Sequence, residues 1–192
     1  IRGHYEYTNA LLSDAKKDPM CKGLILWPEL SHGDPFVIEY FAKNAWEKSA
    51  RPISELVDEF CSDRYTEDLA LKLAEIWHTF MPVAQIDSWS SGGEYRPYGD
   101  DMFFTIRKKT EFAAENIDDY KNKISRYAPH KAAAAEVLRL LSCIPLDDEM
   151  TKRDAFDIAR TVLCRYINAA IFKAQELYAS NAPLEELEMV TS

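Results

Sequence analysis

The sequence predicts an all-α fold, a helical bundle-like domain preceded by one short strand-like segment. Apolar side chains recur at the three- and four-residue spacing of amphipathic helices along most of the 192 residues. The 6 Gly and 9 Pro are too few for the many turns of a barrel or sandwich of short strands. Only one short run is continuously apolar, so strand is expected nowhere else.

The first helix is expected over residues 5–17, where Leu11, Leu12 and Ala15 share one side and Asp18-Pro19 stops the pattern. A short apolar run closed by a proline follows at residues 23–28. A buried strand has this pattern, although a run this short cannot be separated from a buried helix by periodicity alone.

The next three helices each begin at a capping or proline signal. Asp34 is a good cap with Pro35 at the first helical position, and a second helix opens near Pro52. Thr66 precedes two acidic residues, which favour the positive end of a third helix dipole. This third helix is expected to end near residues 81–82, because Pro82 interrupts the backbone hydrogen bonding.

Residues 87–101 break the helical pattern with a long stretch rich in Ser, Gly and aromatic residues, and loops of this length are usually functional or mobile. Helices are expected again over residues 102–127, 129–143 and 151–179. The last is expected to bury one face along its whole length, made of Ala155, Ala159, Val162, Tyr166, Ala170, Ala174 and Leu177. Residues 181–183 should end it, and a further helix begins in residues 184–192.

Composition limits the classes of partner and cofactor. The net charge of −9 and the pI near 5.0 disfavour nucleic acid as a partner. The sequence contains no run of 18 apolar residues, so no membrane span is predicted. The four Cys and four His are scattered without ligand spacing, so we expect no metal site and no cofactor.

Glu29 is the candidate catalytic residue. It follows the apolar run directly, behind Pro28 and before a polar turn. In β/α barrels, catalytic side chains stand at the carboxyl ends of strands, and glycoside hydrolysis uses two such carboxylates. From spacing alone, Glu29 is also explained simply as the first polar residue after a buried strand.

Residues 23–29 and 34–46 resemble the late barrel strand and the following helix of the α-N-acetylglucosaminidase family of retaining glycosidases. Further segments come in the family's order, namely residues 54–65 with their final Arg64-Tyr65 pair, 132–143, 154–161 and 166–178. This resemblance implies that residues 1–33 are the last part of a truncated catalytic β/α barrel. It also implies that residues 34–192 are an incomplete C-terminal helical domain.

In that family the Glu of the Pro-Glu pair is the nucleophile, and Glu29 occupies the matching position. The resemblance implies that the acid/base residue lies upstream, outside this chain. The segment is then inactive alone, and its glycan substrate is bound by the intact parent in a secreted, periplasmic or lysosomal setting. The apolar surface of the truncated barrel segment also offers a route to self-association.

One histidine and several aromatic side chains are further candidates for contacts with a sugar or for the core. His32 is either a sugar contact or a solvent-facing turn residue, whereas Trp46 and Trp77 are expected in the core. The aromatic residues of the irregular stretch either stack on a sugar ring or pin the stretch against the helices; they are Trp89, Tyr95 and Tyr98. The alternative function is a non-catalytic helical scaffold or interaction domain in which Glu29 is incidental.

Overall fold

The computed structural model describes residues 5–26, 35–86 and 117–191 of the chain, and this described part is helical without a strand. Its elements are α1 (Tyr5–Lys17), α2 (Pro35–Trp46), α3 (Ile53–Arg64), α4 (Glu67–Ala84), α6 (Ile117–Tyr127), the 3₁₀ turn η2 (Ala128–His130), α7 (Lys131–Leu141), α8 (Glu149–Ala179) and α9 (Leu184–Thr191). The predicted all-α class is confirmed.

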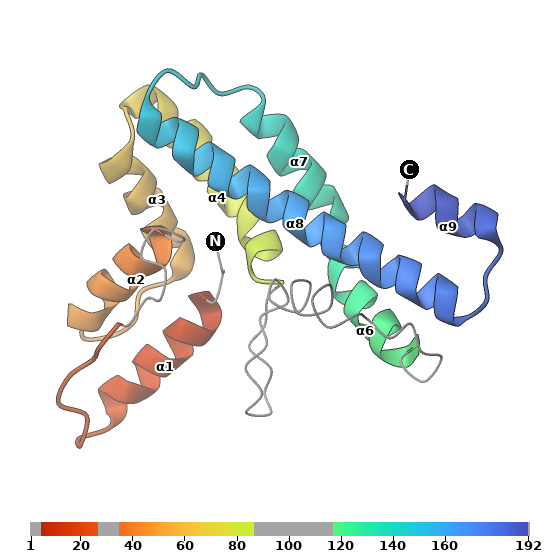
Figure 1. Cartoon of the computed structure of the whole chain (residues 1–192). Coiled ribbons are helices and arrows are strands. Elements are labelled where there is room, and N and C mark those ends of the chain that lie inside the picture. The colour runs from red at the N-terminus through yellow and green to blue at the C-terminus, as the bar shows by residue number, and fades with distance from the viewer. Residues whose placement is uncertain (1–4, 27–34, 87–116, 192) are drawn as a thin grey trace.

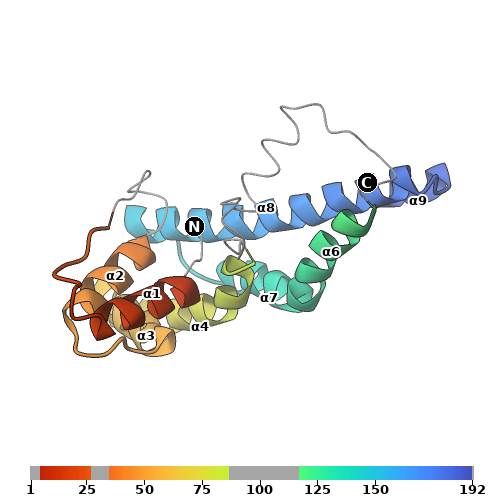
Figure 2. The ribbon, with the colours of Figure 1, turned by 90° about the horizontal axis from the view of Figure 1, so that it is seen from below.

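Helix α8 runs along the length of the molecule, and the other helices are arranged on it (Figure 1). Helices α4 and α7 pack against α8, while α6 and α9 contact its C-terminal half. Helices α1, α2 and α3 gather at the opposite end, and α3 packs mainly against α4 (Figure 2). The termini of the described chain therefore lie on different parts of one elongated helical body.

A cluster of aromatic rings holds the first four helices together. The Phe36 ring lies 5.0 Å from the Tyr5 ring, 5.3 Å from the Phe60 ring and 5.5 Å from the Trp77 ring, measured between centroids. Phe80 continues the cluster at 5.7 Å from Trp77. All five side chains are at most 1% exposed, and mostly edge-to-face pairs of this kind add attraction beyond the burial of area. The predicted core position of Trp77 is confirmed.

The prediction for Trp46 is wrong, because this side chain is 91% exposed at the last residue of α2. The apolar stripe of α2 buries Phe36 and Tyr40, and Asn44 continues it in the next turn. Trp46 falls outside that stripe.

Helix α4 passes through the proline that was expected to end it. Pro82 lies in the last turn, and the helix continues to Ala84. Val83 and Ala84 are fully buried, and the Gln85 amide donates to the Met81 carbonyl at 3.1 Å. Burial and this terminal hydrogen bond compensate for the donor that proline lacks.

Helix α8 begins two residues before its expected start, because the Asp148 carboxylate accepts the Thr151 amide at 2.8 Å as an N-cap. Its C-terminal end is a Schellman motif. The Ala182 amide donates to the Leu177 carbonyl at 2.9 Å, and Asn181 has the left-handed φ of 54° that this motif requires.

The buried face of α8 differs from the predicted face. Ala155, Val162 and Leu177 are buried, but the other four residues of the predicted stripe are partly exposed. A neighbouring stripe is buried instead and is largely polar, consisting of Asp154, Ile158, Thr161, Arg165, Asn168, Phe172 and Gln175. Helices α4, α6 and α7 all pack on α8, so burial does not follow its apolar residues alone.

Candidate functional site

Glu29, the predicted catalytic residue, lies outside the described residues, and so do His32, Trp89, Tyr95 and Tyr98. The structure does describe what flanks Glu29 in the chain. Residues 21–26, which include most of the predicted strand-like run, form neither helix nor strand, and Ile25 is 87% exposed.

Helices α1 and α2, on either side of that connection, are fixed to each other. Tyr5 of α1 and Phe36 of α2 meet in the aromatic cluster, as described above. At the other end of α1, the Lys16 ammonium donates to the backbone carbonyls of Asn44 and Glu47. The helices that precede and follow the connection with Glu29 are thus packed against each other.

An ion network joins α2 to α3. The Lys43 ammonium lies 2.7 Å from the Glu39 carboxylate, 2.8 Å from Glu59 and 3.1 Å from Asp63. Desolvation alone lowers the pKa of Lys43, but these three carboxylates outweigh it and hold the pKa above its ordinary value. Arg51 reaches Glu59 from the opposite side at 2.7 Å. All the cations here are satisfied, so the network is structural.

A buried clamp joins the end of α3 to α8. The Arg64 guanidinium donates to both oxygens of Asp154, at 2.6 and 3.1 Å, and the Tyr65 hydroxyl donates to the same carboxylate at 2.7 Å. Asp154 is 2% exposed. Burial and the Asp154 charge raise the pKa of Tyr65, so the phenol stays protonated as a donor.

A polar cavity of about 490 Å³ opens between α1, α3 and α4. It is lined by a carboxylate, two amides, a hydroxyl and an imidazole, from Glu6, Asn9, Gln85, Ser54 and His78. The Glu6 backbone amide donates to the Gln85 side-chain oxygen at 3.2 Å, which ties α1 to the end of α4. This mixture of donors and acceptors suits a neutral ligand rich in hydroxyl groups.

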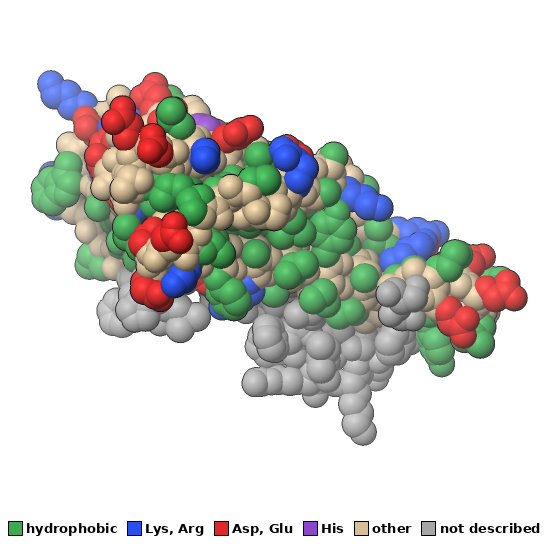
Figure 3. All heavy atoms as spheres, turned by 90° about the horizontal axis from the view of Figure 1, so that it is seen from above, with side chains coloured by type: hydrophobic (Ala, Val, Ile, Leu, Met, Phe, Trp, Pro, Cys, Tyr) green, Lys and Arg blue, Asp and Glu red, His purple; other side chains and the backbone are tan. Residues whose placement is uncertain are grey.

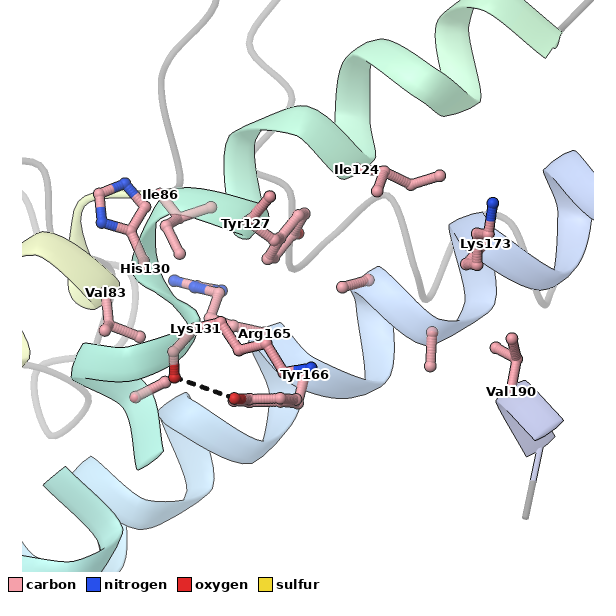
Figure 4. A pocket seen from close by; sticks show the side chains of 14 residues that line it. Val83, Ile86, Ile124, Tyr127, His130, Lys131, Arg165, Tyr166, Lys173 and Val190 are labelled. Atoms are coloured by element: carbon pink, nitrogen blue, oxygen red, sulfur yellow. Dashed lines mark hydrogen bonds between the residues drawn. The ribbon is translucent and has the colours of Figure 1, made fainter. Parts of the chain in front are cut away.

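A second cavity, of about 330 Å³, is mainly apolar and is formed by α6, η2, α7 and α8 together with residues from the end of α4 and from α9 (Figure 4). We call it the α6–α8 cavity. Its walls include Ile86, Ile124, Ala169, Ala170 and Val190. Its size lies at the lower end of the range for small-molecule sites.

The polar groups that line the α6–α8 cavity are basic or hydroxyl groups. They belong to His130, Lys131, Arg165 and Lys173, with the hydroxyls of Tyr127 and Tyr166, and no Asp or Glu side chain contributes to the lining. The Tyr166 hydroxyl donates to the Lys131 backbone carbonyl at 3.1 Å, which joins α8 to α7 at the cavity wall.

The basic lining contrasts with the surface charge seen in Figure 3. There, Asp and Glu side chains are most numerous toward the two ends of the visible surface, and Lys and Arg side chains are interspersed among them and between them. The chain as a whole carries a charge of −9. Four basic residues thus lie at the walls of one cavity in an acidic chain, and one of them, Lys173, is paired with Glu176 at 2.7 Å.

Sequence reasoning missed both cavities. The apolar spacing of α8 pointed to a face that does not include Arg165. The only available signal was the polar residues recurring at helical spacing from Asp154 onward, and periodicity of polar residues does not distinguish a solvated face from a buried polar stripe.

Within residues 5–26, 35–86 and 117–191, no three His, Cys, Asp or Glu side chains come together as a metal-binding group. Over the same ranges, none of the helices has both the length and the apolar character needed to cross a bilayer. Comparison with known proteins found no matching family model, no matching curated protein and no matching solved structure.

Proposed function

We propose that this chain is part of a retaining glycoside hydrolase that removes terminal α-linked N-acetylglucosamine from glycans, with Glu29 as its nucleophile. The proposal rests on the resemblance of residues 23–29 and 34–46 to the α-N-acetylglucosaminidase family. The observation that carries it furthest is the position of Glu29 in the sequence, directly after the Pro28 that closes the apolar run and in the connection between α1 and α2.

The chemistry follows the two-carboxylate scheme of retaining enzymes. Glu29 attacks the anomeric carbon and forms a glycosyl-enzyme, while a carboxylic acid from outside residues 1–192 protonates the departing oxygen. The same group then takes a proton from water, which hydrolyses the intermediate. The polar cavity of Glu6, Asn9 and Gln85 supports this proposal, because its side chains suit sugar hydroxyls.

The test is hydrolysis of an aryl α-N-acetylglucosaminide by the longer parent polypeptide. Glu29→Gln should lower kcat on the order of a thousandfold or more, whereas the exposed Glu75→Gln serves as the matched control and should retain the rate. Azide should restore turnover of Glu29→Ala and release a glycosyl azide of inverted configuration, which a structural role for Glu29 does not explain. A Glu29→Gln variant with the parent's rate would contradict the assignment.

A non-catalytic interaction domain is the second candidate, favoured by the α6–α8 cavity, which belongs to the helical part alone. Hydrogen exchange on the isolated chain separates the two proposals. On the enzyme proposal, residues 21–26 exchange quickly in the isolated chain and become protected in the parent. Equal protection of residues 21–26 and α8 in the isolated chain would favour the self-contained interaction domain.

A further inference from the structure

We propose that the polar cavity between α1, α3 and α4 binds a neutral pyranoside, that is, a single sugar ring without a formal charge. The inference does not depend on the role of Glu29, because the lining residues belong to these three helices or to the residues that adjoin them. It rests on three features of the cavity: walls fixed by contacts between helices, hydrogen-bonding groups of both kinds, and apolar side chains in the same lining.

The walls of the cavity are held in place by contacts between the helices. The Glu6 backbone amide of α1 donates to the Gln85 side-chain oxygen at the end of α4, at 3.2 Å. The His78 Nε2 atom of α4 lies 2.6 Å from the Asp58 carboxylate of α3, and α3 packs along α4 (Figure 2). A site built by such contacts keeps its shape without a ligand, so less conformational entropy is lost when a ligand binds.

The same contacts set the roles of the hydrogen-bonding groups. The Gln85 oxygen is occupied by the Glu6 amide, which leaves the NH₂ group of Gln85 as a donor. Because the Asp58 carboxylate only accepts, His78 Nε2 is the donor to it, and Nδ1 of the neutral ring is an acceptor. Asn9 lines the cavity too, and its Oδ1 atom is a buried acceptor without a hydrogen-bond partner among the described residues. The cavity thus offers both donors and acceptors.

This combination matches hydroxyl groups better than it matches an anion. A hydroxyl donates one hydrogen bond and accepts others, so several hydroxyls on one ring can use donors and acceptors together. An anion would use the donors alone and would lie near the Glu6 carboxylate, which is accompanied by no Lys or Arg among the described residues of the lining. The lining therefore favours a neutral ligand rich in hydroxyl groups over an anionic one.

Apolar side chains favour a sugar ring over an open-chain polyol. Ile53 and Met81 line the same cavity, together with Pro52 before the start of α3. A pyranose ring carries hydroxyls at its edge and C–H groups on its faces, so it can contact both kinds of wall at once. Burial of a C–H face adds a hydrophobic contribution that hydroxyl groups alone do not supply. The cavity volume of about 490 Å³ lies within the range of small-molecule sites.

The first measurement is a titration of the isotope-labelled 192-residue chain, followed through its amide chemical shifts. Methyl α-glucopyranoside should bind saturably in the millimolar range, with the shifts located in α1, α3 and α4. Cyclohexanol, a six-membered ring with one hydroxyl, should bind at least about tenfold more weakly, because it loses two or more hydrogen bonds. The uronate of the same glucoside should also bind more weakly, because its carboxylate lies near Glu6. No saturable binding of the glucoside, or equal affinity for cyclohexanol or the uronate, would overturn the proposal.

Variants at exposed positions locate the site without disturbing the core. Ser54→Leu places a larger apolar side chain in the cavity and should weaken the glucoside by at least about tenfold. Ser62→Leu is the matched control, because Ser62 is exposed on the same helix but does not line the cavity, and its affinity should be unchanged. Circular dichroism verifies that both variants fold. Equal affinities of the two folded variants would refute the site.

A second pair of variants tests the hydrogen bonds themselves. Asn9→Leu nearly preserves the size of the side chain but removes its donor and acceptor, so the glucoside should weaken by at least about fivefold and cyclohexanol should change little. Asn122→Leu, at an exposed position of α6 outside the cavity, should change neither. Equal losses for the glucoside and cyclohexanol in Asn9→Leu would contradict recognition of hydroxyl groups. Failure here leaves the Glu29 assignment to its own test, since that test measures hydrolysis by the parent polypeptide.

Discussion

Asp154 offers the sharpest test of how the two ends of this fold are joined. Its carboxylate accepts three hydrogen bonds, two from Arg64 and one from Tyr65, and these connect the end of α3 to α8. Asp154→Asn keeps the size of the side chain but removes its charge. The amide then presents an N–H₂ donor to groups that are themselves donors.

The expected loss of stability follows from the burial of the clamp. Removing one partner of a buried ion pair typically costs 3–5 kcal/mol, and Arg64 is 24% exposed, so water partly compensates its charge. We expect a loss of about 3 kcal/mol for Asp154→Asn. For a chain of this length, that corresponds to a decrease of about 6–12 °C in melting temperature. Tyr65→Phe removes a single bond to a charged acceptor and should cost about 1.5 kcal/mol.

The assay is thermal and urea unfolding followed by far-UV circular dichroism. The matched control is the Arg139–Glu136 pair, in which Arg139 also donates two hydrogen bonds to one carboxylate, at 2.7 and 2.5 Å, but both side chains are exposed. Glu136→Gln should leave the melting temperature almost unchanged, because solvent screens the pair. If Asp154→Asn loses no more stability than Glu136→Gln, the assignment of the clamp as a stabilising connection is wrong.

Three further predictions concern the core of α1–α4. Trp77→Ala should destabilise the fold by about 3–5 kcal/mol in urea unfolding, because it removes a buried ring of the aromatic cluster. Trp46→Ala, at a 91% exposed position, should change the free energy of unfolding by less than about 0.5 kcal/mol. Similar losses in the two variants would contradict the described core. Burial and nearby carboxylates raise the pKa of Cys61 from 9.0 to about 12, so iodoacetamide at pH 8 should label the exposed Cys143 and spare Cys61. The pKa of the Cys61 thiol is higher in the folded chain than in the unfolded chain, so the stabilisation by the buried neutral thiol is complete below pH 9.0 and is lost as the pH rises toward 12. Cys61→Ala should therefore reduce the loss of unfolding free energy between these pH values. An unchanged slope of stability against pH would contradict the burial of this thiol.

The helices were predictable from local signals. Residues 5–17 carry an apolar stripe between clear stops, and the structure has α1 over the same residues. Pro52 and Thr66 mark the starts of α3 and α4, because their conformations are set by neighbouring residues in the chain. The exception is the end of α4, where burial of Val83 and Ala84 outweighs the local effect of Pro82.

The candidate site was less predictable. The resemblance selected Glu29, which lies outside the described residues and stays a prediction. The α6–α8 cavity carried no local signal, since Lys131 and Arg165 have the spacing and type of ordinary surface residues. Their convergence depends on how α7 meets α8, and residues 34 positions apart in the chain are brought together only by that packing.

The sequence by itself determined the helical class and the starts of α2, α3 and α4, because apolar periodicity and capping signals act over a few neighbouring residues. Only the tertiary structure decided which face of α8 is buried, that Trp46 points to solvent, and that Asp154 is clamped by Arg64 and Tyr65. A buried polar residue is stabilised by partners from distant parts of the chain, and no local pattern records where those partners will be.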